Sequence, residues 1–126
     1  MLRQEILQCL VSSRRCDDGA AVFLFRFPAT LTAFRGHFPG EPVLPGVCSI
    51  QAALLATEAD RGQRLRLAAI RSAKFLAFVP PDGEVEFLCR FLPAERATAL
   101  LTSTVRCGER RIAELALQVA ILGERP

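Results

Sequence analysis

Apolar residues are most concentrated between residues 47 and 59, a segment rich in alanine and leucine that contains neither glycine nor proline. Its residues are good helix formers, and its length gives about three to four helical turns. The segment is apolar nearly all round until Thr57 and Glu58. Because a helix without a polar face is buried on all sides, we expect one central helix, ended by Arg61-Gly62, that other elements wrap.

The other apolar segments have the length and composition of β-strands. An Asp-Gly turn at residues 18–19 joins the first two as a hairpin, and turns rich in proline or glycine separate the later ones. The predicted strands are residues 5–11, 21–27, 65–79, 84–91, 98–106 and 111–121. A strongly curved antiparallel sheet wrapped around one long helix satisfies this order. The sequence therefore predicts the α+β class and the hotdog fold, as a single domain over residues 1–126.

The loop before the helix carries the candidate chemistry. Residues 36–46 contain the only histidine of the chain, His37, together with three prolines and three glycines. Histidine titrates near neutrality, which makes it the default acid–base candidate. Free N–H groups at the helix start, Gly46-Val47, can hold an oxygen on which negative charge develops. A base beside such a site is what proton abstraction next to a thioester carbonyl requires.

Composition argues against several other classes of protein. Hydrophobic residues make up 51% of the chain, but no apolar run reaches the roughly eighteen residues of a membrane span. The net charge of +3 comes without the dense basic stripes of a nucleic-acid-binding protein. The five cysteines are scattered, with no CxxC pair, so we expect no metal site. Since signal-peptide features are also missing, we expect a cytoplasmic location.

The segment Gly36-His37-Phe38-Pro39-Gly40, followed after one residue by Pro42-Val43-Leu44-Pro45-Gly46-Val47, resembles a known active-site motif. It is similar to that of the 3-hydroxyacyl-(acyl-carrier-protein) dehydratases of bacterial fatty acid synthesis, the FabZ/FabA type. The order of predicted elements agrees over most of the chain. The sequence also resembles short stand-alone relatives in aryl-polyene and polyketide-like pathways.

The resemblance implies a role for several residues. His37 would remove the proton alpha to the thioester carbonyl, the carbonyl oxygen of Val43 would orient its imidazole, and the N–H of Gly46 would polarise the substrate carbonyl. Contacts with the substrate are expected at Phe38, Val43, Pro45 and Val47.

The resemblance also implies partners. The acyl group would be carried on the phosphopantetheine of acyl carrier protein or coenzyme A, with no other cofactor. Two hotdog subunits would build the site together, in a homodimer or a higher homo-oligomer. A heterodimer with a related hotdog protein is the alternative.

The sequence departs from the family at one catalytic position. Fourteen residues after His37 the family has a carboxylate on the partner's helix that protonates the leaving hydroxyl, and this chain has Gln51. An amide can donate a hydrogen bond but is not an acid. Three hypotheses stay open: a dehydratase in which His37 shuttles the proton and Gln51 positions the hydroxyl; an acyl thioesterase or isomerase; and a non-catalytic acyl-binding subunit whose partner supplies the acid.

Overall fold

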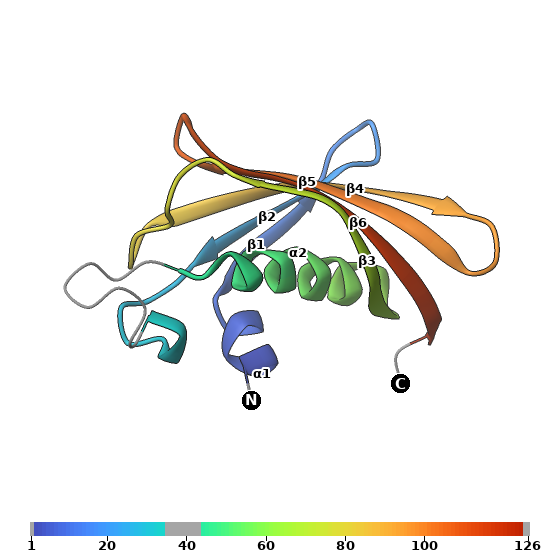
Figure 1. The fold of residues 1–126 in the computed structure, drawn as a ribbon, viewed down its shortest axis with the longest axis horizontal. Coiled ribbons are helices and arrows are strands. Elements are labelled where there is room, and N and C mark those ends of the chain that lie inside the picture. The colour runs from blue at the N-terminus through green and yellow to red at the C-terminus, as the bar shows by residue number, and fades with distance from the viewer. Residues whose placement is uncertain (1, 35–43, 125–126) are drawn as a thin grey trace.

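A computed structural model describes residues 2–34 and 44–124, so His37, Phe38 and Val43 lie outside the described residues. Six strands form one sheet in the order β1-β2-β4-β5-β6-β3, with antiparallel neighbours. They are β1 (Leu10–Arg15), β2 (Ala21–Arg26), β3 (Gln63–Phe75), β4 (Glu84–Ala94), β5 (Thr98–Cys107) and β6 (Arg110–Glu124). The sheet curves over one long helix, α2 (Figure 1), which confirms the predicted hotdog arrangement.

Helix α2 spans Gly46–Arg61 and follows Pro45, whose φ of −59° suits a helix entry. Gly62 ends it in the left-handed conformation, with its N–H bonded to the Glu58 carbonyl. Its side chains from Cys48 to Glu58 are buried apart from half-buried Gln51. The expected buried helix is therefore confirmed, but one strip of it, at Val47 and Gln51, reaches the surface.

The N-terminal segment differs from the prediction. Residues 5–11 were expected as a strand, whereas Leu2–Leu7 form a short helix, α1, and β1 starts only at Leu10. The helical turn places Ile6 completely in the core and lets Arg3 reach Glu58 of α2, with 3.2 Å between the guanidinium and carboxylate atoms. These tertiary contacts outweigh the β propensity of the apolar run.

The strand after the helix also ends earlier than predicted. β3 stops at Phe75, and residues 76–79 run on as an irregular segment. The ladder ends because the N–H groups of Leu76 and Ala77 both donate to the same carbonyl, that of Ile112. Val79 in turn accepts a hydrogen bond from the Leu44 N–H at 3.2 Å. The irregular segment is therefore tied to the residues that lead into α2.

Strands β5 and β6 alternate buried and less buried residues, so the Ala/Leu-rich last segment is a strand, as predicted. A one-turn 3₁₀ helix, η1 (Thr32–Phe34), lies in the connector after β2 and buries Phe34. Among the described residues no helix is long and apolar enough to cross a membrane.

Candidate active site

The start of α2 has free N–H groups, which the predicted oxyanion donor at Gly46 requires. Gly46 and Val47 open the first helical turn, in which N–H groups have no acceptor within the helix. The Cys48 N–H turns back to the Pro45 carbonyl at 2.9 Å. The partial positive charge of the helix end therefore stays available to a carbonyl oxygen that approaches Gly46.

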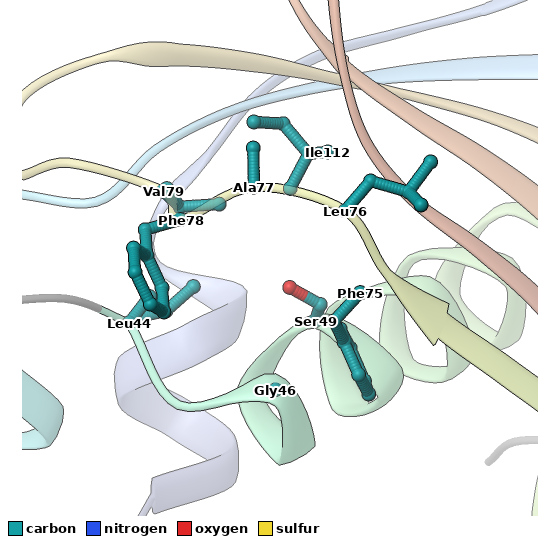
Figure 2. A pocket seen from close by; sticks show the side chains of 9 residues that line it. All are labelled: Leu44, Gly46, Ser49, Phe75, Leu76, Ala77, Phe78, Val79 and Ile112. Atoms are coloured by element: carbon teal, nitrogen blue, oxygen red, sulfur yellow. The ribbon is translucent and has the colours of Figure 1, made fainter.

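A cavity of about 350 Å³ adjoins this helix start. Its wall is almost entirely apolar, and its residues come from the helix entry, the irregular segment after β3 and the start of β6. They are Leu44, Gly46, Ser49, Phe75, Leu76, Ala77, Phe78, Val79 and Ile112. Figure 2 shows that the hydroxyl of Ser49, the one polar side chain among them, points from α2 toward the segment that carries Ala77. The cavity suits an aliphatic chain better than a charged group.

The ring of Phe75 lies against the first turn of α2 (Figure 2). A Cβ atom added at Gly46 would come within 2.7 Å of the Cζ atom of that ring, which is too close for van der Waals contact. Glycine is therefore required at this position as long as the ring stays in place. The close approach of Phe75 thus gives a steric reason for the glycine at this position of the motif in this chain.

A second hollow, a groove of about 610 Å³, runs along the other side of α2 between this helix and the start of β3. Gln51 and Val47 lie on it, and Val47 is 55% exposed. The amide oxygen of Gln51, Oε1, is buried and has no hydrogen-bond partner among the described residues. A buried acceptor without a donor is costly, so the groove favours an incoming group that can donate a hydrogen bond to Gln51.

Glu58 lies on the same groove, two helical turns after Gln51, but both its oxygens are occupied. Oε2 accepts the Leu65 N–H at 2.8 Å, and Oε1 accepts a hydrogen bond from Arg3 at 3.2 Å. The residue is buried and joins α2 to both β3 and α1. Glu58 therefore has a structural role, since its carboxylate holds α2 to β3 and to α1.

The predicted site residues are thus distributed over two places. Gly46 lines the apolar cavity, Val47 and Gln51 line the groove, and half-buried Pro45 precedes the helix. Gln51 follows Gly46 by five positions, which places the two about 140° apart around the helix axis. Gly46 and Gln51 of one chain therefore line different hollows.

Cys48 is the described cysteine nearest to the start of α2, and its side chain is buried. Burial, and secondarily the nearby Cys9 thiol, raises the pKa of Cys48 in the first turns of α2, so this group stays a thiol near neutrality. Among residues 2–34 and 44–124, no cluster of histidine, cysteine, aspartate or glutamate side chains could hold a metal ion.

Several residues around the site were not singled out from the sequence. They include Ser49 and Ile112 in the apolar cavity and the arginines Arg3, Arg64 and Arg66 on the groove. No local sequence pattern could have identified them, because they come from segments far apart in the chain. These segments meet only when α1 packs on α2 and β6 pairs with β3.

Comparison with known proteins gives a family and a set of relatives. The ApeI-like family model, described as ApeI dehydratase, matches residues 13–111, which includes the loop motif and Gln51. The 3-hydroxyacyl-(acyl-carrier-protein) dehydratase FabZ of Pediococcus pentosaceus is 32% identical over 91 residues, 67% of this chain and 61% of the relative. The chain thus spans about three fifths of the length of this relative and of FabZ of Levilactobacillus brevis, and about two fifths of FabZ of Clostridium acetobutylicum.

Solved structures support the fold. The dehydratase heterocomplex ApeI:P from Xenorhabdus doucetiae aligns with a TM-score of 0.75 at 20% identity, over 88% of this chain and 96% of that one. A hypothetical thioesterase with coenzyme A from Streptococcus pneumoniae aligns with a TM-score of 0.71 at 11% identity, over 99% and 97%. Both likenesses show the hotdog fold alone. The family match, however, covers most of the chain, and this protein therefore belongs to the ApeI-like dehydratase family.

Proposed function

We propose that this chain is a subunit of a 3-hydroxyacyl-thioester dehydratase, which removes water from a 3-hydroxyacyl group and leaves a trans-2-enoyl thioester. The acyl group would be carried on the phosphopantetheine of an acyl carrier protein, in fatty acid or related biosynthesis. The family match and the activity named for the FabZ relatives support this proposal.

One observation carries the proposal: Gly46 and Gln51 of one chain lie in separate hollows. Each chain then contributes two half-sites, and a second hotdog subunit packed along the edge strand β3 would join the loop and Gly46 of one chain to the groove of the other. The unpartnered oxygen of Gln51 favours a hydroxyl group or a water molecule as the ligand there.

In the proposed reaction His37 takes the proton from C2, and the electron pair of that C–H bond forms the C2–C3 double bond. Negative charge that develops on the thioester oxygen is stabilised by the Gly46 N–H. The C3–O bond breaks, and the departing hydroxyl takes the proton from His37 and leaves as water. Gln51 would hold this hydroxyl through its amide, which positions the leaving group without supplying a proton.

A second candidate function has the same substrate, but it assigns substrate binding and acid catalysis to different subunits. The chain would bind the acyl thioester, and a non-identical hotdog subunit would supply the acid. Two observations favour it: position 51 is an amide, and both oxygens of Glu58, the one carboxylate among the described residues that line the groove, accept hydrogen bonds.

The test is to incubate the purified chain with 3-hydroxyacyl and enoyl thioesters of an acyl carrier protein and follow the loss or gain of water by mass spectrometry. We expect interconversion of the two, reduced about 10²- to 10⁴-fold by His37→Ala. Arg14→Ala, at the opposite edge of the sheet, is the control and should keep full turnover. Release of free acid would instead identify a thioesterase, migration of the double bond an isomerase, and full turnover by His37→Ala would refute the assignment of the base.

A further inference from the structure

Ser49 is a polar residue inside an otherwise apolar cavity. It is 3% exposed, and Figure 2 shows its hydroxyl pointing from α2 into the space between the helix and residues 76–79. The other described residues that line the cavity have apolar side chains, apart from Gly46, which has none. No hydrogen bond joins the Ser49 hydroxyl to another described residue. A hydroxyl buried without a partner costs free energy, so this one favours a ligand that can pair with it.

Two other buried polar side chains, by contrast, are paired within the chain. The Glu58 carboxylate and the Ser103 hydroxyl each have a hydrogen-bond partner among the described residues. A serine inside a helix commonly donates to the carbonyl four residues back, which here belongs to Pro45. The Ser49 hydroxyl makes no such bond. Its position is therefore explained better by what enters the cavity than by the stability of the helix.

Ser49 lies within one helical turn of the Gly46 N–H. The two residues are three positions apart, which separates them by about 60° around the helix axis and about 4.5 Å along it. Both line the same cavity. In the proposed function the thioester oxygen meets the Gly46 N–H, so the acyl chain continues past Ser49. The separation along the axis corresponds to roughly three to four carbon–carbon bonds of about 1.5 Å, so Ser49 faces the chain near C5.

The apolar wall restricts which group can pair with Ser49. A serine hydroxyl both donates and accepts, so it pairs with a hydroxyl, carbonyl or ether oxygen. None of the described lining residues carries a charge, so a carboxylate or an amine would lose its hydration without a counter-ion. A plain hydrocarbon chain would leave the Ser49 hydroxyl unpaired, and a site with a buried polar group rejects the ligand that cannot pair with it. The cavity therefore favours a chain with a neutral oxygen.

We propose that Ser49 determines substrate specificity, and that the cavity selects 3-hydroxyacyl groups with a second, neutral oxygen near C5. The inference rests on the proposed function in one respect, because that function places the thioester at Gly46. It adds the class of acyl chain, which neither the family match nor the loop motif specifies.

The test offers the purified chain two substrates of equal size. They are the 3-hydroxyoctanoyl and 3-hydroxy-5-oxaoctanoyl thioesters of one acyl carrier protein, which differ only in an ether oxygen that replaces the C5 methylene. The two are mixed in equal amounts, and loss of water from each is followed by mass spectrometry, which gives the ratio of their kcat/KM values. We expect the wild-type chain to favour the ether substrate, and Ser49→Ala to lower the ratio about fivefold or more.

The ratio isolates the role of Ser49. It does not depend on the amount of folded protein, so a merely structural role would lower both rates and leave the ratio unchanged. Thr57→Val is the matched control, because it removes another buried hydroxyl of α2, on a hollow of only about 10 Å³, and should keep the wild-type ratio. A ratio that Ser49→Ala leaves unchanged would overturn the inference and would mean that the hydroxyl pairs only with water. An equal fall in Thr57→Val would overturn it too.

A binding measurement separates this inference from the proposed reaction. The same two acyl chains are joined to pantetheine through an amide, and their Kd values for the wild-type chain and Ser49→Ala are measured by isothermal titration calorimetry. Tighter binding of the ether analogue that depends on Ser49 would support the inference even if no substrate lost water, which would refute the proposed reaction alone. Water loss from both substrates at a ratio independent of Ser49 would refute the inference alone. Failure of both analogues to bind would also overturn the inference.

Discussion

The two sides of α2 differ in what they leave unsatisfied. On the Gly46 side the helix start meets an apolar cavity, and Phe75 lies directly on the backbone. On the Gln51 side the groove is rimmed by arginines, and a buried amide oxygen has no donor. The first side is apolar apart from Ser49 and tightly packed, whereas the second holds a buried acceptor atom without a partner among the described residues. The difference teaches that the two sides of one helix suit different groups of a ligand, as the proposed function requires.

The largest expected effect on stability concerns Glu58, whose carboxylate joins α2 to β3 and α1 beside the groove. Glu58→Ala leaves the buried Leu65 N–H without an acceptor and should lower the free energy of unfolding by about 2–3 kcal/mol, measured by urea denaturation. Arg3→Ala is the matched control: it removes only a partner whose side chain is 59% exposed and should cost about 1 kcal/mol or less. If the two variants lost equal stability, the carboxylate would not be the structural link.

The next largest effect on stability is expected on the Gly46 side of α2, where Phe75 packs against the helix. Gly46→Ala forces the ring of Phe75 to move and should cost about 1–2 kcal/mol of stability along with a loss of turnover. Phe75→Ala in the same chain removes the clash, so a double-mutant cycle should give a coupling of about 1 kcal/mol. Additive effects of the two substitutions would show that the ring does not restrict position 46.

The smallest effect on stability is expected on the Gln51 side of α2, which faces the groove. Gln51→Leu replaces an unpartnered buried acceptor by an apolar group of similar size, so the free energy of unfolding should stay the same or rise by up to about 1 kcal/mol. Turnover of a 3-hydroxyacyl thioester should nevertheless fall, because the leaving hydroxyl loses its contact. A clear loss of stability would mean that the amide already has a partner in the folded chain.

The sequence predicts the elements with strong periodicity and misses those that tertiary contacts decide. The helix was expected at residues 47–59 and spans Gly46–Arg61. The prediction is close because the segment is rich in helix formers and Gly62 ends the helix. The prediction of a strand at the start of the chain was wrong. The apolar run around Ile6 fits a strand or a helix, and only its packing on α2 selects the helix.

One strand boundary shows the same limit. The strand that begins at Glu84 was expected to end at residue 91, yet β4 continues through Pro93 to Ala94. β2 pairs only with Glu84–Cys89, so β4 is free on one side at Pro93, and the missing N–H breaks no ladder there. Whether a strand has a neighbour at a given residue cannot be known from local sequence.

The site was predictable only in part. The loop motif predicts a role for Gly46, and the position fourteen residues after His37 predicts one for Gln51; the helical spacing already places the two on different sides of the helix. The ring of Phe75 on Gly46, the occupied oxygens of Glu58 and the position of β3 at the sheet edge depend on segments that are distant in sequence. None of these contacts has a signature in the local pattern.

In the proposed function, Gln51 occupies the place of the acid in a dehydration site. The most direct measurement is the rate of water loss from a 3-hydroxyacyl thioester by Gln51→Glu and by the wild-type chain. A restored carboxylic acid should raise that rate about tenfold or more and leave the release of free acid unchanged. An unchanged rate of water loss, with the wild-type chain hydrolysing the thioester, would contradict the account.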